Sequence, residues 1–314
     1  MGLPVVLGGM AGYTDLAYRL ICRRLGAEFC TTEMMLDKCL LVGRKLLERL
    51  AAITEEDHPV AGQIIGNDPA MVARAASVLS LAGFDAIDIN LACPVNKTLK
   101  RRRGGYLLNE PDRSLEIVRA VLASCDRPVT VKIRCGVKEA GDAGFWPIVE
   151  GAFKAGVAAV TVHARTVQAK YAGRADWGFL AEVKRRFWDR TIVGSGDILT
   201  PQAAIDALMQ TGVDAVAVAR GALGNPWFFL QVKDILAGRP LYQPSLAEQR
   251  RLLMGHFEHA CQIYGAIRGP KIMRKFGIKY AKLHPVPREV RSAFVGVKKT
   301  KDWREVVETL YAPQ

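Results

Sequence analysis

Short apolar segments alternate with longer amphipathic segments over the first three quarters of the chain. Several of the short segments are apolar at nearly every position, which is typical of strands buried on both faces of a sheet. Eight strands are predicted in this way, at residues 4–8, 29–33, 60–64, 86–90, 129–134, 159–162, 191–194 and 215–219. Helices are predicted between them, for example at residues 69–82, 112–124, 145–155, 177–187 and 201–210. A glycine follows three of these helices, where it commonly ends a helix, at Gly83, Gly156 and Gly212.

This alternation predicts the α/β class and a (β/α)8 TIM barrel, which typically takes about 250 residues. A doubly wound sheet is the alternative, but no G-x-G-x-x-G turn follows the first strand. The pattern breaks at residues 238–240 (GRP), and no strand is predicted beyond Ser245. Four predicted helices follow, at residues 246–264, 270–283, 288–297 and 302–311. We therefore expect a barrel domain in residues 1–238 and a small all-helical domain in residues 245–314.

The positive charge is concentrated in the predicted helical domain. The formal net charge is +13, and the last 70 residues hold 14 Lys and Arg against six Asp and Glu, whereas the rest holds 30 against 25. A basic tail on a nearly balanced body favours a polyanionic partner, nucleic acid first and a membrane surface second. A basic surface that only confers solubility is the alternative.

Composition narrows the class of protein further. No apolar run approaches the roughly 18 residues that span a bilayer, and the first residues lack the basic region of a secretion signal. The seven cysteines are odd in number and include no C-x-x-C pair, which argues against a disulfide framework or a zinc site. We expect a cytoplasmic, monomeric protein that needs neither a metal nor a membrane.

Polar residues and glycines gather where the predicted strands end, which is where TIM barrels place their active sites. The turns 195–197 and 219–221 follow the last two strands, where such barrels commonly bind a phosphate, and Arg220 adds a charge. With Lys132 on the fifth strand and Gln63 on the third, these turns predict an FMN site. The Lys132 ammonium would stabilise reduced flavin near its N1–C2 edge, and Gln63 would bond the other edge. Ordinary turn glycines and a strand-end ion pair are the alternative.

Cys93 is the candidate catalytic residue. It lies just after the fourth strand, before Pro94, in a loop rich in Lys and Arg, which predicts an exposed and electropositive thiol rather than a core cysteine. A thiol is mostly protonated at neutral pH and can act as a general acid. A nucleophilic role is the alternative, although no Cys–His pair can be identified in the sequence.

The densest run of positive charge is the segment 100–105 (KRRRGG). Four cations followed by two glycines beside the predicted active site indicate a mobile lid that contacts an anionic polymer. A solvated basic loop is the simpler interpretation.

Eight segments that run in order along the barrel resemble motifs of the bacterial tRNA-dihydrouridine synthase family. They are residues 9–15 (GMAGYTD), 32–34 (TEM), 88–94 (DINLACP), 131–134 (VKIR), 162–166 (VHART), 171–177 (YAGRADW), 194–198 (GSGDI) and 219–227 (ARGALGNPW). The D-I-N-x-x-C-P and R-G-A-x-G-N-P-W segments are the most specific. Residues 264–265 and 274–275 resemble the family's RNA-binding helical domain more loosely. Three residues depart from the family pattern without removing a catalytic group: Gly9, Ser195 and Phe276.

The resemblance implies a specific reaction. FMN, reduced by NADPH, would pass a hydride from N5 to C6 of a uracil in tRNA and give 5,6-dihydrouridine, while Cys93 gives the proton to C5. Positions that match flavin contacts are Met10, Ala11, Gln63, Lys132, His163, Arg165, Ser195, Gly196, Asp197, Ala219, Arg220 and Gly221. Expected substrate contacts are Asn90, Lys97, Arg101, Arg102, Arg103, Lys271, Arg274 and Lys275. Two rivals remain: an FMN barrel that reduces a free pyrimidine, and an RNA-binding barrel without catalysis.

Overall fold

Nine parallel strands form the centre of the computed structural model, which describes residues 2–43, 47–48 and 50–312. They are β1 (Val5–Leu7), β2 (Cys30–Thr31), β3 (Met35–Leu36), β4 (Val60–Ile65), β5 (Ala86–Leu91), β6 (Val129–Arg134), β7 (Ala159–His163), β8 (Thr191–Ser195) and β9 (Ala215–Val218). The sheet closes because β1 pairs with β9 and with β2, and β2 also pairs with β4. β2 and β3 together take one of the eight strand places, so the predicted TIM barrel is confirmed.

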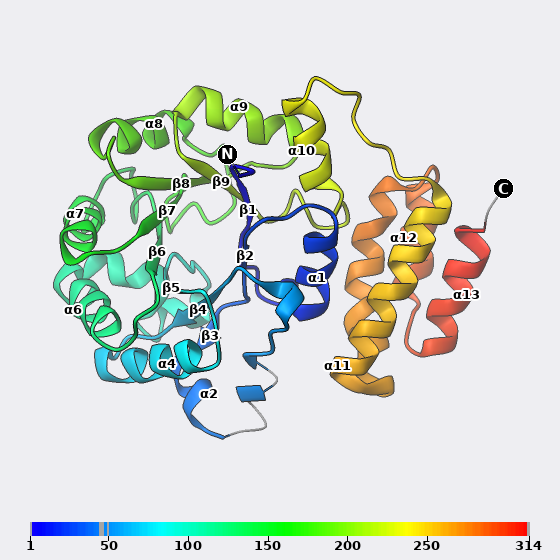
Figure 1. The fold of residues 1–314 in the computed structure, drawn as a ribbon, viewed down its shortest axis with the longest axis horizontal. Helices are drawn as coiled ribbons and strands as arrows, with labels where there is room; N and C mark the ends of the chain where they lie inside the picture. Colours follow the sequence, from blue (N-terminus) through cyan, green and yellow to red (C-terminus); the bar gives the residue numbers. More distant parts are fainter. Residues whose placement is uncertain (1, 44–46, 49, 313–314) are drawn as a thin grey trace.

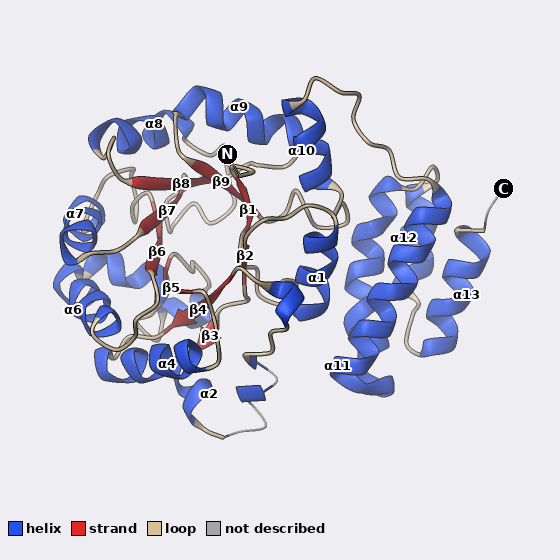
Figure 2. Cartoon of the chain, in the orientation of Figure 1, coloured by secondary structure: helices blue, strands red, loops and turns tan. Residues whose placement is uncertain are grey.

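Helices cover the outside of this barrel, as Figures 1 and 2 show. They are α1 (Leu16–Arg24), α2 (Asp37–Leu41), α4 (Pro69–Leu81), α6 (Pro111–Leu122), α7 (Phe145–Ala155), α8 (Trp177–Arg186), α9 (Pro201–Thr211) and α10 (Phe228–Leu236). Capping sets their ends, since the Asp68 carboxylate accepts from the Met71 amide at the start of α4. Gly156 and Gly212 end α7 and α9 with φ of 106° and 67°, a conformation that glycine adopts without strain.

Beyond Ser245 the described part of the chain contains helices joined by short connections and no strand. It holds α11 (Leu246–Tyr280), the short turn η3 (Ala281–Leu283), α12 (Pro287–Val295) and α13 (Thr300–Leu310). α11 is broken at Gly265, where φ is 80°, so the two helices predicted there meet at this glycine. Between α11, α12 and α13, the ring of Trp303 stacks on Phe257 at 5.1 Å and packs against Phe294 at 4.8 Å. The division into domains at residues 238 and 245 stays a prediction.

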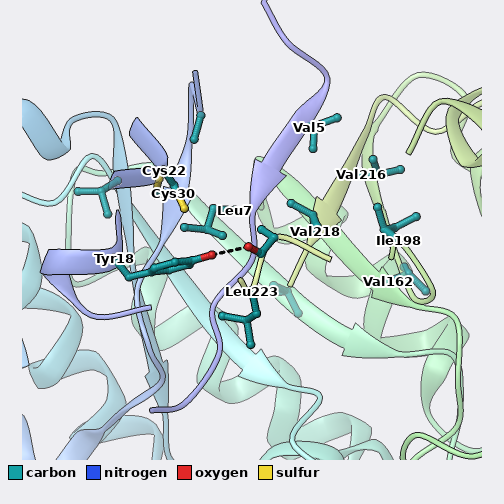
Figure 3. Close-up of a cluster of buried hydrophobic side chains, with 14 of the residues drawn as sticks. Val5, Leu7, Tyr18, Cys22, Cys30, Val162, Ile198, Val216, Val218 and Leu223 are labelled. Atoms are coloured by element: carbon teal, nitrogen blue, oxygen red, sulfur yellow. Dashed lines mark hydrogen bonds between the residues drawn. The ribbon is translucent and has the colours of Figure 1, made fainter. Parts of the chain in front are cut away.

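The helical segment packs against the barrel beside α1 (Figure 1). Tyr18 on α1 is fully buried there, and its ring lies 5.5 Å from that of Phe276 on α11. Its hydroxyl donates to the carbonyl oxygen of Ala222 at 2.6 Å, the bond drawn in Figure 3 beside Leu7 and Val218. One tyrosine therefore connects α1, α11 and the turn after β9 within a continuous apolar core.

No helix in the described part of the chain is both long enough and apolar enough to span a membrane.

Candidate active site

The carboxyl ends of the barrel strands surround a cavity of about 160 Å³. Ten of the residues predicted for the site line it: Met10, Ala11, Gln63, Asn90, Cys93, Lys132, His163, Ser195, Ala219 and Arg220. A smaller cavity of about 30 Å³ adjoins it and adds Gly196 and Asp197. The structure therefore brings most of the predicted flavin contacts and the candidate catalytic thiol to one place.

Two unpartnered nitrogen groups lie in this cavity. Nε2 of His163 is buried and has no hydrogen-bond partner among the described residues. Burial, followed by the charges of Arg134 and Lys132, lowers the pKa of His163 to about 2, so its imidazole is neutral. The Lys132 ammonium has no hydrogen bond or ion pair within the described chain, and burial lowers its pKa although nearby Asp88 opposes the shift. A buried polar atom normally has a partner, so Nε2 of His163, together with the half-buried Lys132 ammonium in the same lining, fits a polar ligand that enters the cavity.

The turns after β8 and β9 carry the charges predicted to hold a phosphate. Arg165 donates to both oxygens of Asp197, at 2.6 and 2.7 Å, and Arg220 approaches the same carboxylate at 3.4 Å. Burial alone raises the pKa of Asp197, but the hydrogen bonds from Arg165 and the Ala175 amide lower it below its usual value. Two guanidinium groups thus face one carboxylate, and the cluster keeps a net positive charge.

Arg165 and Gly221 lie outside the lining of both cavities. Besides Asp197, the Arg165 guanidinium donates to the carbonyl oxygens of Ala172 and Gly173, at 3.2 and 2.7 Å. Arg165 therefore fixes the long loop after β7. A Cβ on Gly221 would lie 2.3 Å from the carbonyl oxygen of Ile198, so glycine lets the turns after β8 and β9 approach each other closely.

The Cys93 thiol lines the cavity, but its residue is only 7% exposed. The expectation of an exposed thiol was wrong, because the turn η2 (Gly104–Asn109) packs over the loop. The amide of Gly105 donates to the Cys93 carbonyl at 3.1 Å, and the thiol donates to the Thr98 hydroxyl at 3.6 Å. At Gly104, φ is 57° and a Cβ would lie 2.9 Å from Cβ of Cys93. The two glycines of the basic run therefore allow the close approach that buries the thiol.

The cations of the basic run, and Lys97 just before it, differ in exposure. Lys97, on the short α5 (Asn96–Leu99), is exposed, as are Lys100 and Arg101. Arg102 is exposed and pairs with Glu110. Arg103 is buried, with its guanidinium 4.0 Å from the Asp37 carboxylate. The structure therefore leaves three of these five cations open to solvent without an ion pair in the described chain.

The three cations predicted on α11 also differ. Lys271 and Arg274 are exposed. Lys275 instead turns toward the barrel, where its ammonium donates to the carbonyl oxygen of Gly12 and lies 4.8 Å from the ring centre of Tyr13. Burial lowers the pKa of Lys275, and the nearby carboxylates of Glu33 and Asp15 act against this shift. Its place in the fold is the junction between α11 and the loop after β1.

Known proteins resemble the chain over nearly its full length. The family model described as dihydrouridine synthase (Dus) matches residues 6–312. The chain belongs to the dihydrouridine synthase family. Members of this family are flavin oxidoreductases, so the predicted family resemblance and the prediction of an enzyme are both confirmed.

Curated relatives of this family member agree with that assignment. It is 39% identical to tRNA-dihydrouridine synthase B of Xanthomonas campestris pv. campestris over 290 residues, which cover 92% of this chain and 86% of that protein. It is 35% identical to tRNA-dihydrouridine synthase B of Pseudomonas putida over 300 residues, which cover 95% and 88%. The similarity therefore includes both the barrel and the basic helical segment.

Solved structures share the fold with this dihydrouridine synthase family member. A complex of 2-naphthoyl-CoA reductase with 2-naphthoyl-CoA superposes with a TM-score of 0.58 at 13% identity, and histamine dehydrogenase from Rhizobium sp. 4-9 with 0.54 at 15%. They match 75% and 82% of this chain, which spans about half the length of each. At these identities the likeness concerns the barrel fold alone.

Sequence reasoning assigned no site role to Arg134 and Tyr171, which also line the cavity. Tyr171 is 59% exposed, and its ring centre lies 5.7 Å from the Arg134 guanidinium and 5.1 Å from that of Arg220. Arg134 donates to the carbonyl oxygen of Ala92, next to Cys93, at 3.0 Å. The position of Arg134 at a strand end was the available signal. Tyr171 lies in a long loop, and its place depends on how that loop folds.

A second cavity, of about 250 Å³, lies between the loops after β1 and β2 and α11. Its lining includes Asp15, Glu33, Tyr264 and Lys275, and the Tyr264 hydroxyl donates to Asp15 at 2.8 Å. Burial raises the pKa of both carboxyl groups. The described residues contain no cluster of three or more metal-binding side chains here or elsewhere.

Proposed function

We propose that the chain reduces a specific uridine of tRNA to 5,6-dihydrouridine, with FMN held in the cavity at the barrel mouth and NADPH as the electron donor. The observation that carries the proposal is the arrangement of the cavity, where Cys93 shares the lining with Lys132 and with His163, whose Nε2 has no partner among the described residues. Family membership and relatives named tRNA-dihydrouridine synthase B support the same reaction.

The residues present fit a flavin. The ammonium of Lys132 would face the ring edge that becomes negative on reduction, and Nε2 of His163 would gain the partner it lacks. The exposed Arg220 would hold the phosphate, while the buried Arg165 fixes Asp197 and adds positive charge behind the turn. When bound, FMN supplies the hydride that goes to uracil C6.

Cys93 then supplies the proton to uracil C5. Its thiol can donate at neutral pH because a thiol is mostly protonated there. The covering turn at Gly104 and Gly105 keeps the thiol at the cavity wall and limits access of water to it. A nucleophilic role would need a base beside the thiol, and the hydroxyl of Thr98 is the hydrogen-bond partner that it has.

The target base must leave the RNA stack to enter a cavity at the strand ends. Exposed cations, which include Lys97, Arg101, Lys271 and Arg274, would bind phosphates without reading sequence. We assign the reaction to residues 1–238 and most of the RNA binding to residues 245–314. The cavity lining and the distribution of charge support this division.

The test uses the purified, flavin-loaded protein under anaerobic conditions. The reduced protein is mixed with unmodified tRNA transcript or with free uracil, and flavin reoxidation and dihydrouridine are measured. We expect reoxidation by tRNA only, and Cys93→Ala should keep the flavin and tRNA binding while losing most turnover. Equal reoxidation by a free pyrimidine would assign the chain to the small-molecule class. Protein that stays colourless after added FMN would refute the flavin chemistry, and full turnover by Cys93→Ala would remove its assigned role.

A further inference from the structure

Side chains of three neighbouring strands form a hydrogen-bonded chain beneath the cavity. Gln63 on β4, Asp88 on β5 and Thr130 on β6 occupy paired positions of the parallel sheet. The Thr130 hydroxyl donates to Oδ1 of Asp88 at 2.6 Å, and Nε2 of Gln63 donates to Oδ2 at 2.7 Å. Asp88 is 4% exposed and Gln63 is 2% exposed, so water does not replace these bonds.

The chain continues from Gln63 to the loop that carries the thiol. Nδ2 of Asn90 donates to Oε1 of Gln63 at 2.7 Å. Oδ1 of Asn90 then accepts from the backbone amides of Ala92 and Cys93, both at 3.0 Å. Asp88 and the backbone of Cys93 are therefore joined through two side-chain amides.

The direction of every bond in this chain follows from the carboxylate. An ionised carboxylate only accepts hydrogen bonds, so Gln63 must turn its NH2 group toward Asp88 and its carbonyl oxygen toward Asn90. Asn90 must then donate to Gln63, which leaves its own oxygen for the backbone amide of Cys93. If the Asn90 amide reversed, its NH2 group would face the backbone N–H groups of Ala92 and Cys93, donor against donor.

The pKa of Asp88 is raised overall, but three neighbouring groups favour its acceptor form. Burial raises the pKa of Asp88, whereas the hydrogen bonds from Thr130 and Gln63 and the charge of Lys132 act in the opposite direction. All three groups stabilise the ionised form, in which both oxygens accept.

We propose that Asp88 is a positioning residue for the proton donor: it sets the orientation of the Gln63 and Asn90 amides and so holds the backbone of Cys93 at the cavity wall. The inference rests on the proposed function, because that function makes Cys93 the proton donor. Asp88 has no contact with the reacting atoms and acts through the two amides.

The decisive variants reverse or restore the donor–acceptor order of these hydrogen bonds. Asp88→Asn keeps the shape but presents an NH2 group to Gln63, so the amides must reverse or lose a bond. Asp88→Asn combined with Gln63→Glu restores every donor–acceptor pair, since the carboxylate introduced on β4 accepts from both neighbours. Thr130→Val is the matched control, because it removes one bond to the same carboxylate and leaves the direction toward Gln63 unchanged.

The first readout is independent of turnover. The purified protein, as isolated with its flavin, is treated with iodoacetamide, and the alkylation rate of Cys93 is followed by peptide mass spectrometry. Freeing a buried backbone amide should let Asp88→Asn alkylate roughly tenfold faster than wild type, with Thr130→Val within about threefold. The double variant should return to within about threefold of wild type. The turnover number with tRNA should fall in Asp88→Asn and stay near the wild-type value in Thr130→Val, with flavin retained in both; the double variant is judged by alkylation alone, because Gln63 lines the cavity.

Two results would overturn the inference. One is an Asp88→Asn protein whose Cys93 reacts at the rate of the Thr130→Val protein. The other is a double variant whose alkylation rate is no closer to that of wild type than the rate of either single variant. If Asp88→Asn does not fold, the alkylation rate of the double variant is compared with that of Gln63→Glu alone. Failure of the proposed function would look different, because Cys93→Ala would then retain turnover whatever the alkylation rates show.

Discussion

His256 makes the stability of this enzyme depend on pH in a way that the structure predicts. It is fully buried on α11, with Nδ1 2.9 Å from the Tyr280 hydroxyl and Nε2 without a partner among the described residues. Its ring lies 4.5 Å from that of Phe276, at the junction with the barrel. Burial first, and then the charges of His259 and Lys275, lower the pKa of His256 from 6.5 to about 3.

The sign and size of the effect follow from that shift. Between pH 6.5 and about 3 the unfolded chain holds a proton on His256 and the folded chain does not. Stability is therefore fully present above pH 6.5 and falls as pH is lowered through this window. From pH 7 to pH 5, one such histidine costs about 2 kcal/mol of unfolding free energy. For a chain of 314 residues this corresponds to about 3 °C in Tm.

The assay compares wild type with His256→Phe by thermal unfolding at pH 7 and pH 5. Phenylalanine preserves a ring in the apolar site and removes the titrating group. Other groups, including His163, titrate in both proteins and cancel in the difference. On acidification we expect the Tm of the wild type to fall by about 3 °C more than the Tm of the variant. Equal falls in Tm would show that His256 is protonated in the folded protein at pH 5, which would refute the argument that burial keeps it neutral.

Three further predictions concern the site. In Gly104→Ala the added Cβ would lie 2.9 Å from Cβ of Cys93. The variant should lower turnover on the order of tenfold while flavin absorbance is retained. Wild-type turnover would contradict the close approach of Gly104 to Cys93. Lys271→Glu with Arg274→Glu should weaken tRNA binding in a filter assay and reduce its salt slope by roughly 1–2, with an unchanged slope arguing against phosphate contacts. Lys132→Met should weaken FMN binding by roughly tenfold or more in a fluorescence titration, and wild-type affinity would exclude Lys132 from the flavin site.

The barrel was predictable because its strands are buried on both faces. The predicted strand at 129–134 coincides with β6, and that at 60–64 falls one residue short of β4. The segment 29–33 was predicted as one strand, but β2 ends at Thr31 and β3 begins at Met35. Beyond β2, the carbonyl oxygen of Thr32 comes within 2.3 Å of where a Cβ on Gly9 would lie. An approach between distant loops leaves no periodic signal in the sequence.

The residue types of the site were predictable, but the directions of its charged side chains were not. In the basic run Arg103 turns inward and Arg101 outward, and a loop without periodicity does not distinguish them. On α11 the spacing of the apolar residues does indicate which way the lysines point. Met273, Phe276 and Tyr280 follow helical spacing and are buried, which places Lys275 at the margin of the apolar face and Lys271 farther from it.

The junction shows that the basic tail has two distinct uses for its charge. Lys275 donates to the carbonyl oxygen of Gly12, and Lys282 donates to that of Gly221 at 3.1 Å. These glycines follow Met10–Ala11 and Ala219–Arg220, which belong to the cavity wall. Two tail lysines therefore fix the helical segment to the loops that shape the cavity, and their charge is not free for phosphate. Net charge thus overstates the RNA-binding surface, whereas the same lysines give exposed Lys271 and Arg274 a defined position relative to the Cys93 thiol.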